Sequence, residues 1–524
     1  MKIIELPNGT HAQVANYIQQ DILEYQRNPF IEALPPIFSQ QEVIDQLSVY
    51  PPFHSEERFL ADYKKLHLLS RVMHYFQPLP VHLHIQSSID RLLRAGYMSR
   101  NPLSRAHAKD YVDNWINIQH HKFENTAIQT SQTLSIIGVS GVGKTRTVQK
   151  ILETIPQVIS HTSYDGKPLN QYQITHLTIQ TPFDGSVKTI IFDFFLQFDL
   201  LTGTKYFEKY VNSRLSTSQL MPIMAQIAKN VGVIVIDELQ HLKGVKSKNS
   251  IQLLNFFTTL INQVKIPLII IGTPKSIDIL QSQFRQARRS TNAGNILWDR
   301  MKKDEIWDLF IEGLWKYQWT REPVNFSDEF SSILYDESQG IADIAVKLFM
   351  MVQLRAISDG EESITPDLIR RVSKEELQMV QPMLQALRSN NIQRLADYDD
   401  ITFPNIEAYI QREVIQLEDK DVLGSLKNSI ERQEVQSKVV EDAISRLSLL
   451  GISNDVARET VLNLYSKGIV GLREILEEAY RVIKATSPTS QIENDLREVV
   501  TCGKENGLNA YEALQGAGII RQEY

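Results

Sequence analysis

Three short apolar runs mark the middle of the chain: TLSIIG at 133–138, VGVIVID at 231–237 and PLIIIG at 267–272. Each is apolar at consecutive positions and rich in β-branched residues. This pattern predicts strands buried on both faces, as parallel sheets require. The first run continues through a glycine-rich loop into KTRTVQKILETI at 144–155, whose apolar spacing predicts a helix. A strand, a loop and a helix are therefore expected in that order.

The segment between the first two runs predicts one more strand and helix. A strand should end near Gln180, and a loop with Pro182 and Gly185 should follow it. The next stretch carries four phenylalanines at near-helical spacing, which favours a helix with an aromatic core face. These residues are Phe192, Phe194, Phe195 and Phe198.

Composition narrows the class of protein. The 524 residues are 42% hydrophobic and 22% charged, which is typical of soluble globular chains with two to four domains. A single cysteine, Cys502, excludes a disulfide framework and a zinc site built on cysteine ligands. The start MKIIELPNGTHAQ lacks the features of a signal peptide, and no run approaches the length of a membrane span. We expect a cytoplasmic protein without membrane contact. At a net charge of -7, any nucleic-acid site must be a local basic surface.

The loop after the first strand matches the phosphate-binding pattern G-x-x-x-x-G-K-[ST]. Glycines there let backbone N–H groups close on a polyphosphate at a helix N-terminus. Lys144 would neutralise the β- and γ-phosphates of ATP, and Thr145 would offer its hydroxyl to Mg²⁺. The expected nucleotide-binding residues are Gly138, Val139, Ser140, Gly141, Val142, Gly143, Lys144, Thr145 and Arg146.

The next two strands should end in polar residues at the same edge of the sheet. Asp237 follows the second run and suits Mg²⁺, and Glu238 beside it suits a base that orients the attacking water. Thr273 follows the third run and is expected between the two other motifs. It either senses the γ-phosphate or holds the water, or it caps a helix that starts near Ser276.

Basic residues cluster in two places beyond these motifs. Arg285, Arg288 and Arg289 are candidates for an arginine finger that completes the site of a neighbouring subunit. The alternatives are a solvated basic face or one that meets DNA. A short loop after the second strand holds three lysines without an acid, which favours contact with a phosphate backbone. The candidate DNA-binding residues are Lys243, Lys246 and Lys248, followed by Lys188 and Lys205.

The order GVSGVGKT, VIVIDELQH, IIIGTPK and RQARRS resembles the AAA+ ATPases. More narrowly, the chain resembles the TnsC-type regulators of bacterial cut-and-paste transposons. Stretches outside the nucleotide motifs carry this narrower likeness, which covers about residues 20–400. They are YQRNPFIEALPP at 25–36, YFQPL at 75–79, AGYMSRNP at 95–102, QGIADIAVKLF at 339–349 and PMLQALRS at 382–389.

The resemblance implies an α/β fold: a P-loop ATPase with a parallel sheet flanked by helices and a helical lid. It implies an ATP- and Mg²⁺-dependent regulator that assembles head to tail on double-stranded DNA as a ring or filament. Its partners would be transposase subunits and a target-selecting protein or an RNA-guided complex. In a bacterial cytoplasm it would associate with the nucleoid. A nucleotide-switched scaffold that never touches DNA, or a motor ATPase, remains an alternative.

Four regions are expected along the chain. Residues 1–120 should form an irregular interaction region, because their prolines break any long helix. Residues 121–320 should form the nucleotide-binding core, residues 321–400 the helical lid, and residues 401–524 a helical region that binds partners. The lid departs from many AAA+ lids. Many AAA+ lids place an arginine against the γ-phosphate, whereas this segment has Asp343 and Lys347 instead. Either Lys347 contacts the γ-phosphate or the lid makes no such contact.

Overall fold

The structure is a computed structural model of the chain. It describes residues 2–119, 132–244, 252–253, 255–257, 260, 266–277, 294–389, 409, 439–469, 471–486 and 496–520. The chain divides into two compact units, Met1–Leu417 and Glu418–Tyr524. In the described residues, no helix has both the length and the apolar character needed to cross a membrane.

The first unit is built on one eight-stranded sheet, with the order β1-β2-β4-β5-β6-β7-β3-β8. Its β1–β2 and β4–β5 pairs are antiparallel and its other neighbouring pairs are parallel. The sheet is therefore mixed but mostly parallel. Its strands are β1 (Ile3–Glu5), β2 (His11–Val14), β3 (Thr133–Gly138), β4 (Val158–Tyr164), β5 (Lys167–Gln180), β6 (Val231–Asp237), β7 (Leu268–Gly272) and β8 (Asn295–Trp298).

The three predicted strands are β3, β6 and β7, and they lie side by side. In β6, Val233 and Val235 join one apolar cluster, whereas Ile234 and Ile236 join another. Both faces of this strand are therefore covered, as its unbroken apolar run predicts. The register pairs Ile236 with Ile270 and Ile271 with Ile136, so the carboxyl ends of the three strands meet at one edge.

Helices cover the two faces of the sheet. One cluster joins the sheet to α4 (Pro80–Met98), α6 (Lys144–Glu153) and the helices of residues 305–388. The other joins it to α7 (Val187–Thr202) and α9 (Thr217–Ala228), and includes Phe194, Phe195 and Phe198 as predicted. Phe192, the fourth phenylalanine of the predicted core face, is only partly buried and packs against this cluster. The other α-helices described before the lid are α1 (Pro29–Glu32), α2 (Gln40–Leu47), α3 (Asp62–Leu69), α5 (Arg105–Gln119) and α8 (Tyr206–Val211).

The expectation that prolines break every long helix in the N-terminal region is wrong for α4. This helix runs for 19 residues, with Pro80 at its first position. Proline costs nothing there, because the first N–H groups of a helix have no partner within it. The N-terminal region also supplies two strands, and Gln13 of β2 pairs with Ile159 of β4.

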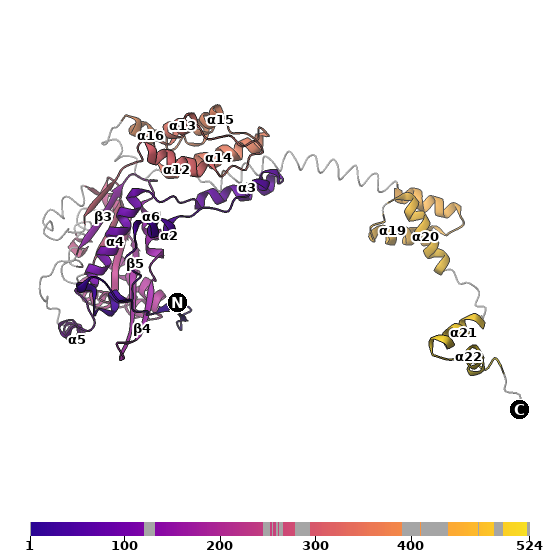
Figure 1. Ribbon diagram of the computed structural model, residues 1–524, viewed down its shortest axis with the longest axis horizontal. Coiled ribbons are helices and arrows are strands. Elements are labelled where there is room, and N and C mark those ends of the chain that lie inside the picture. Colours follow the sequence, from indigo (N-terminus) through magenta and orange to yellow (C-terminus); the bar gives the residue numbers. More distant parts are fainter. Residues whose placement is uncertain are drawn as a thin grey trace. The chain divides into compact units, whose positions relative to one another are not determined.

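Five of the described helices gather at one end of the sheet and form the lid, with α3 beside α14 (Figure 1). They are α12 (Glu305–Trp315), α13 (Asp328–Ser338), α14 (Ala342–Asp359), α15 (Pro366–Glu376) and α16 (Gln381–Arg388). The first of them precedes residues 321–400, the range predicted for the lid. Thr365 caps α15 by accepting a hydrogen bond from the Leu368 N–H at 3.2 Å, and Pro366 occupies the first position of the helix.

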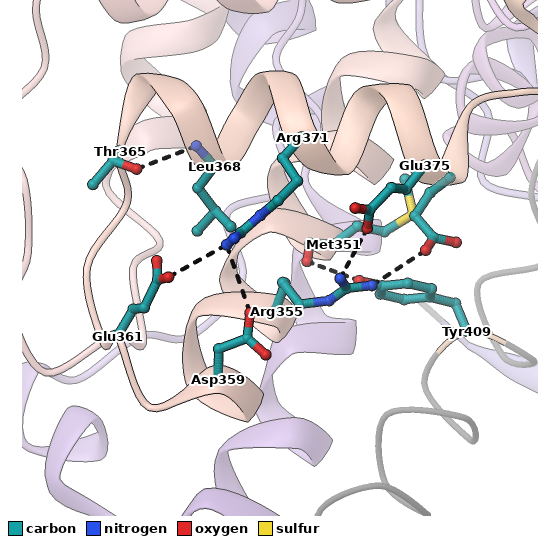
Figure 2. A network of polar contacts seen from close by, with 10 residues as sticks. Met351, Arg355, Asp359, Glu361, Thr365, Leu368, Arg371, Glu375 and Tyr409 are labelled. Carbon is teal, nitrogen blue, oxygen red and sulfur yellow. Dashed lines mark hydrogen bonds and ion pairs between the residues drawn. The ribbon is translucent and has the colours of Figure 1, made fainter.

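Ion pairs tie α14 to α15 and to the loop between them (Figure 2). Arg355 of α14 binds Glu375 at 2.9 Å and Glu376 at 3.3 Å, whereas Arg371 of α15 reaches Glu361 at 3.3 Å. The close-up also shows the Tyr409 hydroxyl donating to the Met351 carbonyl at 3.4 Å.

In its described residues the second unit is helical, as the sequence predicts for the C-terminal region. Residues 439–449 are helical and pack with α19 (Asn454–Ser466) and α20 (Leu472–Thr486) around a small apolar cluster. Two further helices, α21 (Leu496–Glu505) and α22 (Ala510–Gly516), form a hairpin in which Gly503 lies against Ala513.

Candidate nucleotide site

The glycine-rich loop leads from the end of β3 into α6. Gly143 is the N-cap of α6 and has a φ of 104°, a left-handed conformation that glycine adopts without steric cost. Gly138 is needed for a different reason: a Cβ on this residue would lie 2.3 Å from the carbonyl oxygen of Trp298 in β8. The two glycines therefore allow the tight turn and the close approach of the neighbouring strand.

Lys144 lies at the first position of α6 and is 9% exposed. Its Nζ donates hydrogen bonds to the carbonyl oxygens of Gly138 at 2.8 Å and Val139 at 2.9 Å. The ammonium group is thus held over the loop that the sequence predicts as a phosphate cradle. A buried cation at a helix N-terminus suits an anionic ligand.

Thr145 and Asp237 come together from different motifs. The Thr145 hydroxyl donates to Oδ2 of Asp237 at 2.9 Å, and Oδ1 of the same carboxylate accepts from the Glu238 N–H at 2.8 Å. Asp237 is only 2% exposed. A carboxylate and a hydroxyl are hard oxygen ligands that fit Mg²⁺, which otherwise keeps water and phosphate oxygens. These residues therefore fit the predicted cation.

Glu238 follows β6 in an unusual backbone conformation. Its φ is 58°, which costs a residue with a side chain on the order of 1 kcal/mol or more. Its carboxylate accepts a hydrogen bond from Nε2 of Gln240, and both residues line the same cavity as the phosphate loop. Sequence reasoning missed Gln240, whose only signal is its position two residues after Glu238.

Thr273 lies where the strand order requires it, at the end of β7 between β6 and β3. It is 3% exposed, and its Oγ1 has no hydrogen-bond partner. A side chain that capped the following helix would donate or accept a bond at this oxygen. Of the two interpretations of Thr273, the cap is therefore not observed, and a polar atom is left at the cavity.

One cavity of about 1410 Å³ joins these residues. The phosphate loop, Asp237, Glu238 and Thr273 line one part of it. The rest of its wall comes from the N-terminal region, the end of β8 and the lid, a contribution that the motifs did not reveal. The further lining residues include Met73, Phe76, Leu79, Val81, His82, Leu297, Trp298, Arg300, Ala342, Asp343 and Val346.

Arg146 links the start of α6 to the N-terminal region. Its guanidinium donates to the Tyr75 carbonyl at 3.3 Å and lies 5.6 Å from the centre of the Phe76 ring. Burial lowers the pKa of Arg146, and the charge of Asp343 opposes this shift. The predicted nucleotide-binding residue therefore also contacts the N-terminal region and lies within the electrostatic influence of a lid carboxylate.

The lid meets the phosphate loop through the start of α14. The Asp343 N–H donates to the Gly141 carbonyl at 3.2 Å, and the Asp343 carboxylate binds Nζ of Lys347 at 2.7 Å. Asp343 lines the cavity, whereas Lys347 is absent from the lining residues. The structure thus places an acid of the lid, rather than its lysine, at the cavity.

The remaining candidate residues are only partly described. Arg285, Arg288, Arg289, Lys246 and Lys248 lie outside the described residues, as does the side chain of Lys243. Two lysines before β6 are described. Lys188 has its Nζ 5.4 Å from the centre of the Phe192 ring, and Lys205 is an exposed residue that pairs with Glu208 at 3.7 Å.

Comparison with known protein families agrees with this geometry: residues 127–280 match the family model described as an AAA domain. That segment contains β3, the phosphate loop, β6 and β7. Its mostly parallel sheet flanked by helices is the P-loop fold that the AAA+ resemblance implies. No curated protein sequence matches the chain at a significant level.

Among solved structures, the chain is similar to the ORC1 protein of Aeropyrum pernix in complex with DNA, at 13% identity and a TM-score of 0.33. That match covers 62% of this chain and 84% of the other. Cdc6p from Pyrobaculum aerophilum is 14% identical, with a TM-score of 0.33 and coverages of 61% and 87%. Drosophila ORC bound to DNA is 14% identical, with a TM-score of 0.32 and coverages of 64% and 84%. Likenesses this remote carry no argument about function.

Proposed function

We propose that the chain is a Mg²⁺-dependent ATPase that regulates DNA transposition. It binds duplex DNA without reading its sequence, assembles on it head to tail, and couples target selection to the recruitment of a transposase. A targeting protein or an RNA-guided complex supplies the target. The resemblance of residues 20–400 to TnsC-type regulators supports the transposition part, and the cavity supports the ATPase part.

One contact carries the ATPase assignment: the Thr145 hydroxyl on the Asp237 carboxylate at 2.9 Å, beside a buried Lys144. Bound Mg²⁺ would supply charge stabilisation for phosphoryl transfer. In this account, Lys144 binds the phosphates, Thr145 and Asp237 hold the cation, and Glu238 orients the attacking water. Thr273 keeps a buried hydroxyl available at the same edge of the sheet.

The DNA contact is assigned to lysines. Lys243, Lys246 and Lys248 follow β6, and Lys188 and Lys205 border α7. Lysines that neutralise backbone phosphates release counterions, so the affinity they provide falls steeply with salt and is independent of base sequence. Assembly is assigned to an arginine from Arg285, Arg288 and Arg289, which completes the nucleotide site of the next subunit. Such a heterologous contact generates a ring or a helical filament.

Measurement of DNA binding against salt concentration, with and without ATP, tests this function. We expect ATP-dependent binding whose affinity is the same for unrelated duplexes and falls as salt rises. ATP hydrolysis without any DNA binding would instead support a nucleotide-switched scaffold. ATP-dependent strand separation would support a motor.

A variant in which glutamate replaces Lys243, Lys246 and Lys248 tests the assigned DNA contact directly. It should weaken binding to all duplexes by a similar factor, on the order of tenfold or more, because each lysine contacts a phosphate rather than a base. ATP binding by the isolated variant should stay unchanged. Loss of affinity for one sequence alone would contradict backbone contact.

A further inference from the structure

The cavity has an apolar wall with one buried imidazole in it. Away from the phosphate loop, Met73, Leu79, Val81 and Leu297 line this wall. His82 lies among them, 6% exposed, at the third position of α4. Its ring lies between those of Phe76, at 5.0 Å, and Trp298, at 5.3 Å, measured between ring centres. The wall therefore combines flat apolar surfaces with an imidazole ring whose two nitrogens can form hydrogen bonds.

The two nitrogens of His82 differ in their surroundings. Nδ1 accepts a hydrogen bond from the Leu79 N–H at 2.8 Å, so it carries no proton. Burial lowers the pKa of His82 to about 4, so the ring is neutral near pH 7. In a neutral ring with Nδ1 as the acceptor, the proton is on Nε2. Within the described part of the chain, Nε2 has no hydrogen-bond partner, and His82 lines the cavity.

We propose that His82 recognises the base of the nucleotide: its Nε2–H donates a hydrogen bond to a ring nitrogen of adenine. This inference rests on the proposed function, because it needs the phosphates in the loop at Lys144. The Leu79 N–H fixes the tautomer, and the rings of Phe76 and Trp298 fix the orientation of the imidazole. The donor is therefore set before the nucleotide binds.

The hydrogen bonds that the two bases require differ, and this bears on the choice between adenine and guanine. Guanine carries a carbonyl oxygen, a ring N–H and an amino group that all need partners, whereas adenine carries one amino group. The side-chain amide of Gln77, which lines the cavity, already accepts from the Tyr50 hydroxyl at 3.0 Å and donates to the Pro78 carbonyl at 3.4 Å. Polar groups of a buried base that find no partner lower its affinity.

The test pairs a protein variant with analogues of the ligand. Equilibrium binding is measured for ATP and for analogues in which carbon replaces N1, N3 or N7 of adenine. For the wild-type chain, one analogue should bind about three- to tenfold more weakly than ATP, because it lacks the acceptor of a neutral hydrogen bond. For His82→Phe, which keeps a flat ring between Phe76 and Trp298, that difference should vanish.

Two further variants separate recognition from folding. His84 lies two residues away on the exposed face of α4, so His84→Phe should keep the wild-type pattern. His82→Gln offers an oxygen to the Leu79 N–H, as in a capping box, together with an amide donor, and should restore part of the difference. Inorganic tripolyphosphate should bind all variants with the affinity it has for the wild-type chain, because it needs only the phosphate loop.

The outcomes are distinguishable. If the same analogue penalty persists in His82→Phe, or if no analogue binds the wild-type chain more weakly than ATP, the assignment of His82 is wrong. If ATP does not bind, or binds equally to Lys144→Ala, the proposed nucleotide site itself fails. GTP should bind more weakly than ATP to the wild-type chain, and equal affinity would overturn the preference for adenine.

Discussion

At the scale of single residues, the site depends on a few buried polar contacts around one cavity. Lys144, Thr145 and Asp237 were predicted from the sequence. The first two belong to a short phosphate-binding pattern with fixed spacing, and Asp237 directly follows an apolar strand. Gln240 and His82 were not predicted. Each acts through the position of its neighbours, the φ of Glu238 in one case and the Leu79 N–H in the other. Such roles depend on three-dimensional contacts that no local pattern specifies.

Two substitutions separate nucleotide binding from hydrolysis. Lys144→Ala should abolish ATP binding, because it removes the cation over the phosphate loop. Glu238→Gln should leave the dissociation constant within about threefold of wild type and slow hydrolysis on the order of a hundredfold, because an amide is a poor base. Binding is followed by titration calorimetry and hydrolysis by phosphate release. Hydrolysis by Glu238→Gln at the wild-type rate would contradict the role given to Glu238.

Buried histidines make stability depend on pH. Burial lowers the pKa of His82 and of His161 to about 4, below the ordinary value of 6.5. From pH 6.5 downward the unfolded chain binds protons that the folded chain refuses, so the free energy of unfolding falls towards pH 4. Above pH 6.5 this contribution is fully present. Denaturation in urea between about pH 7.5 and pH 5 should show the fall, each pKa unit being about 1.4 kcal/mol.

The matched control for this effect is His161→Gln. His161 is 1% exposed and bonds the Tyr17 hydroxyl and Oε1 of Gln173. Its replacement by an amide that does not titrate should make the pH dependence shallower, whatever it does to stability at pH 7.5. An unchanged slope would show that the folded chain protonates His161 as readily as the unfolded one.

At the scale of elements, the sequence predicted β3, β6 and β7 because their apolar runs encode burial on both faces. It did not predict that β1 and β2 extend the sheet, or that β4 and β5 form an antiparallel hairpin. The partner of a strand depends on long-range packing rather than on its own residues. The ion pairs of the lid, such as Arg355 with Glu375, could not be predicted either. The sequence of each helix shows which residues are polar but not which residues of another helix they contact.

A buried ion pair joins the N-terminal region to the lid. Lys65 of α3 is fully buried and binds Glu362, which follows α14, and also Asp62 at 3.0 Å. Lys65→Met would remove this partner from Glu362, which keeps its ion pair with Arg321 at 3.2 Å, so the expected loss is on the order of 2 kcal/mol. We expect a clearly lower midpoint of thermal unfolding for Lys65→Met by calorimetry.

An exposed pair in the same lid is the control for this prediction. Arg370 and Asp367 lie 3.1 Å apart with 53% and 97% of their side chains exposed. Arg370→Met should change stability by less than about 1 kcal/mol, because solvent screens the pair. Equal losses for Lys65→Met and Arg370→Met would mean that Lys65 does not anchor α3 to the lid.

At the scale of the whole molecule, the phosphate loop lies where the N-terminal region, the sheet and the lid meet. The Asp343 N–H reaches Gly141 of the loop, and Arg146 of α6 contacts Tyr75. A nucleotide bound there would contact all three parts at once. In our account, ATP therefore sets their arrangement and prepares the surface that the next subunit binds.

The most direct test of this account is negative-stain imaging of the full chain with duplex DNA, with and without a non-hydrolysable ATP analogue. We predict ordered rings or filaments on DNA only when the analogue is present, and none with Lys144→Ala under the same conditions. Assemblies that form equally well without nucleotide, or with Lys144→Ala, would contradict the claim that the phosphate held by Lys144 drives assembly on DNA.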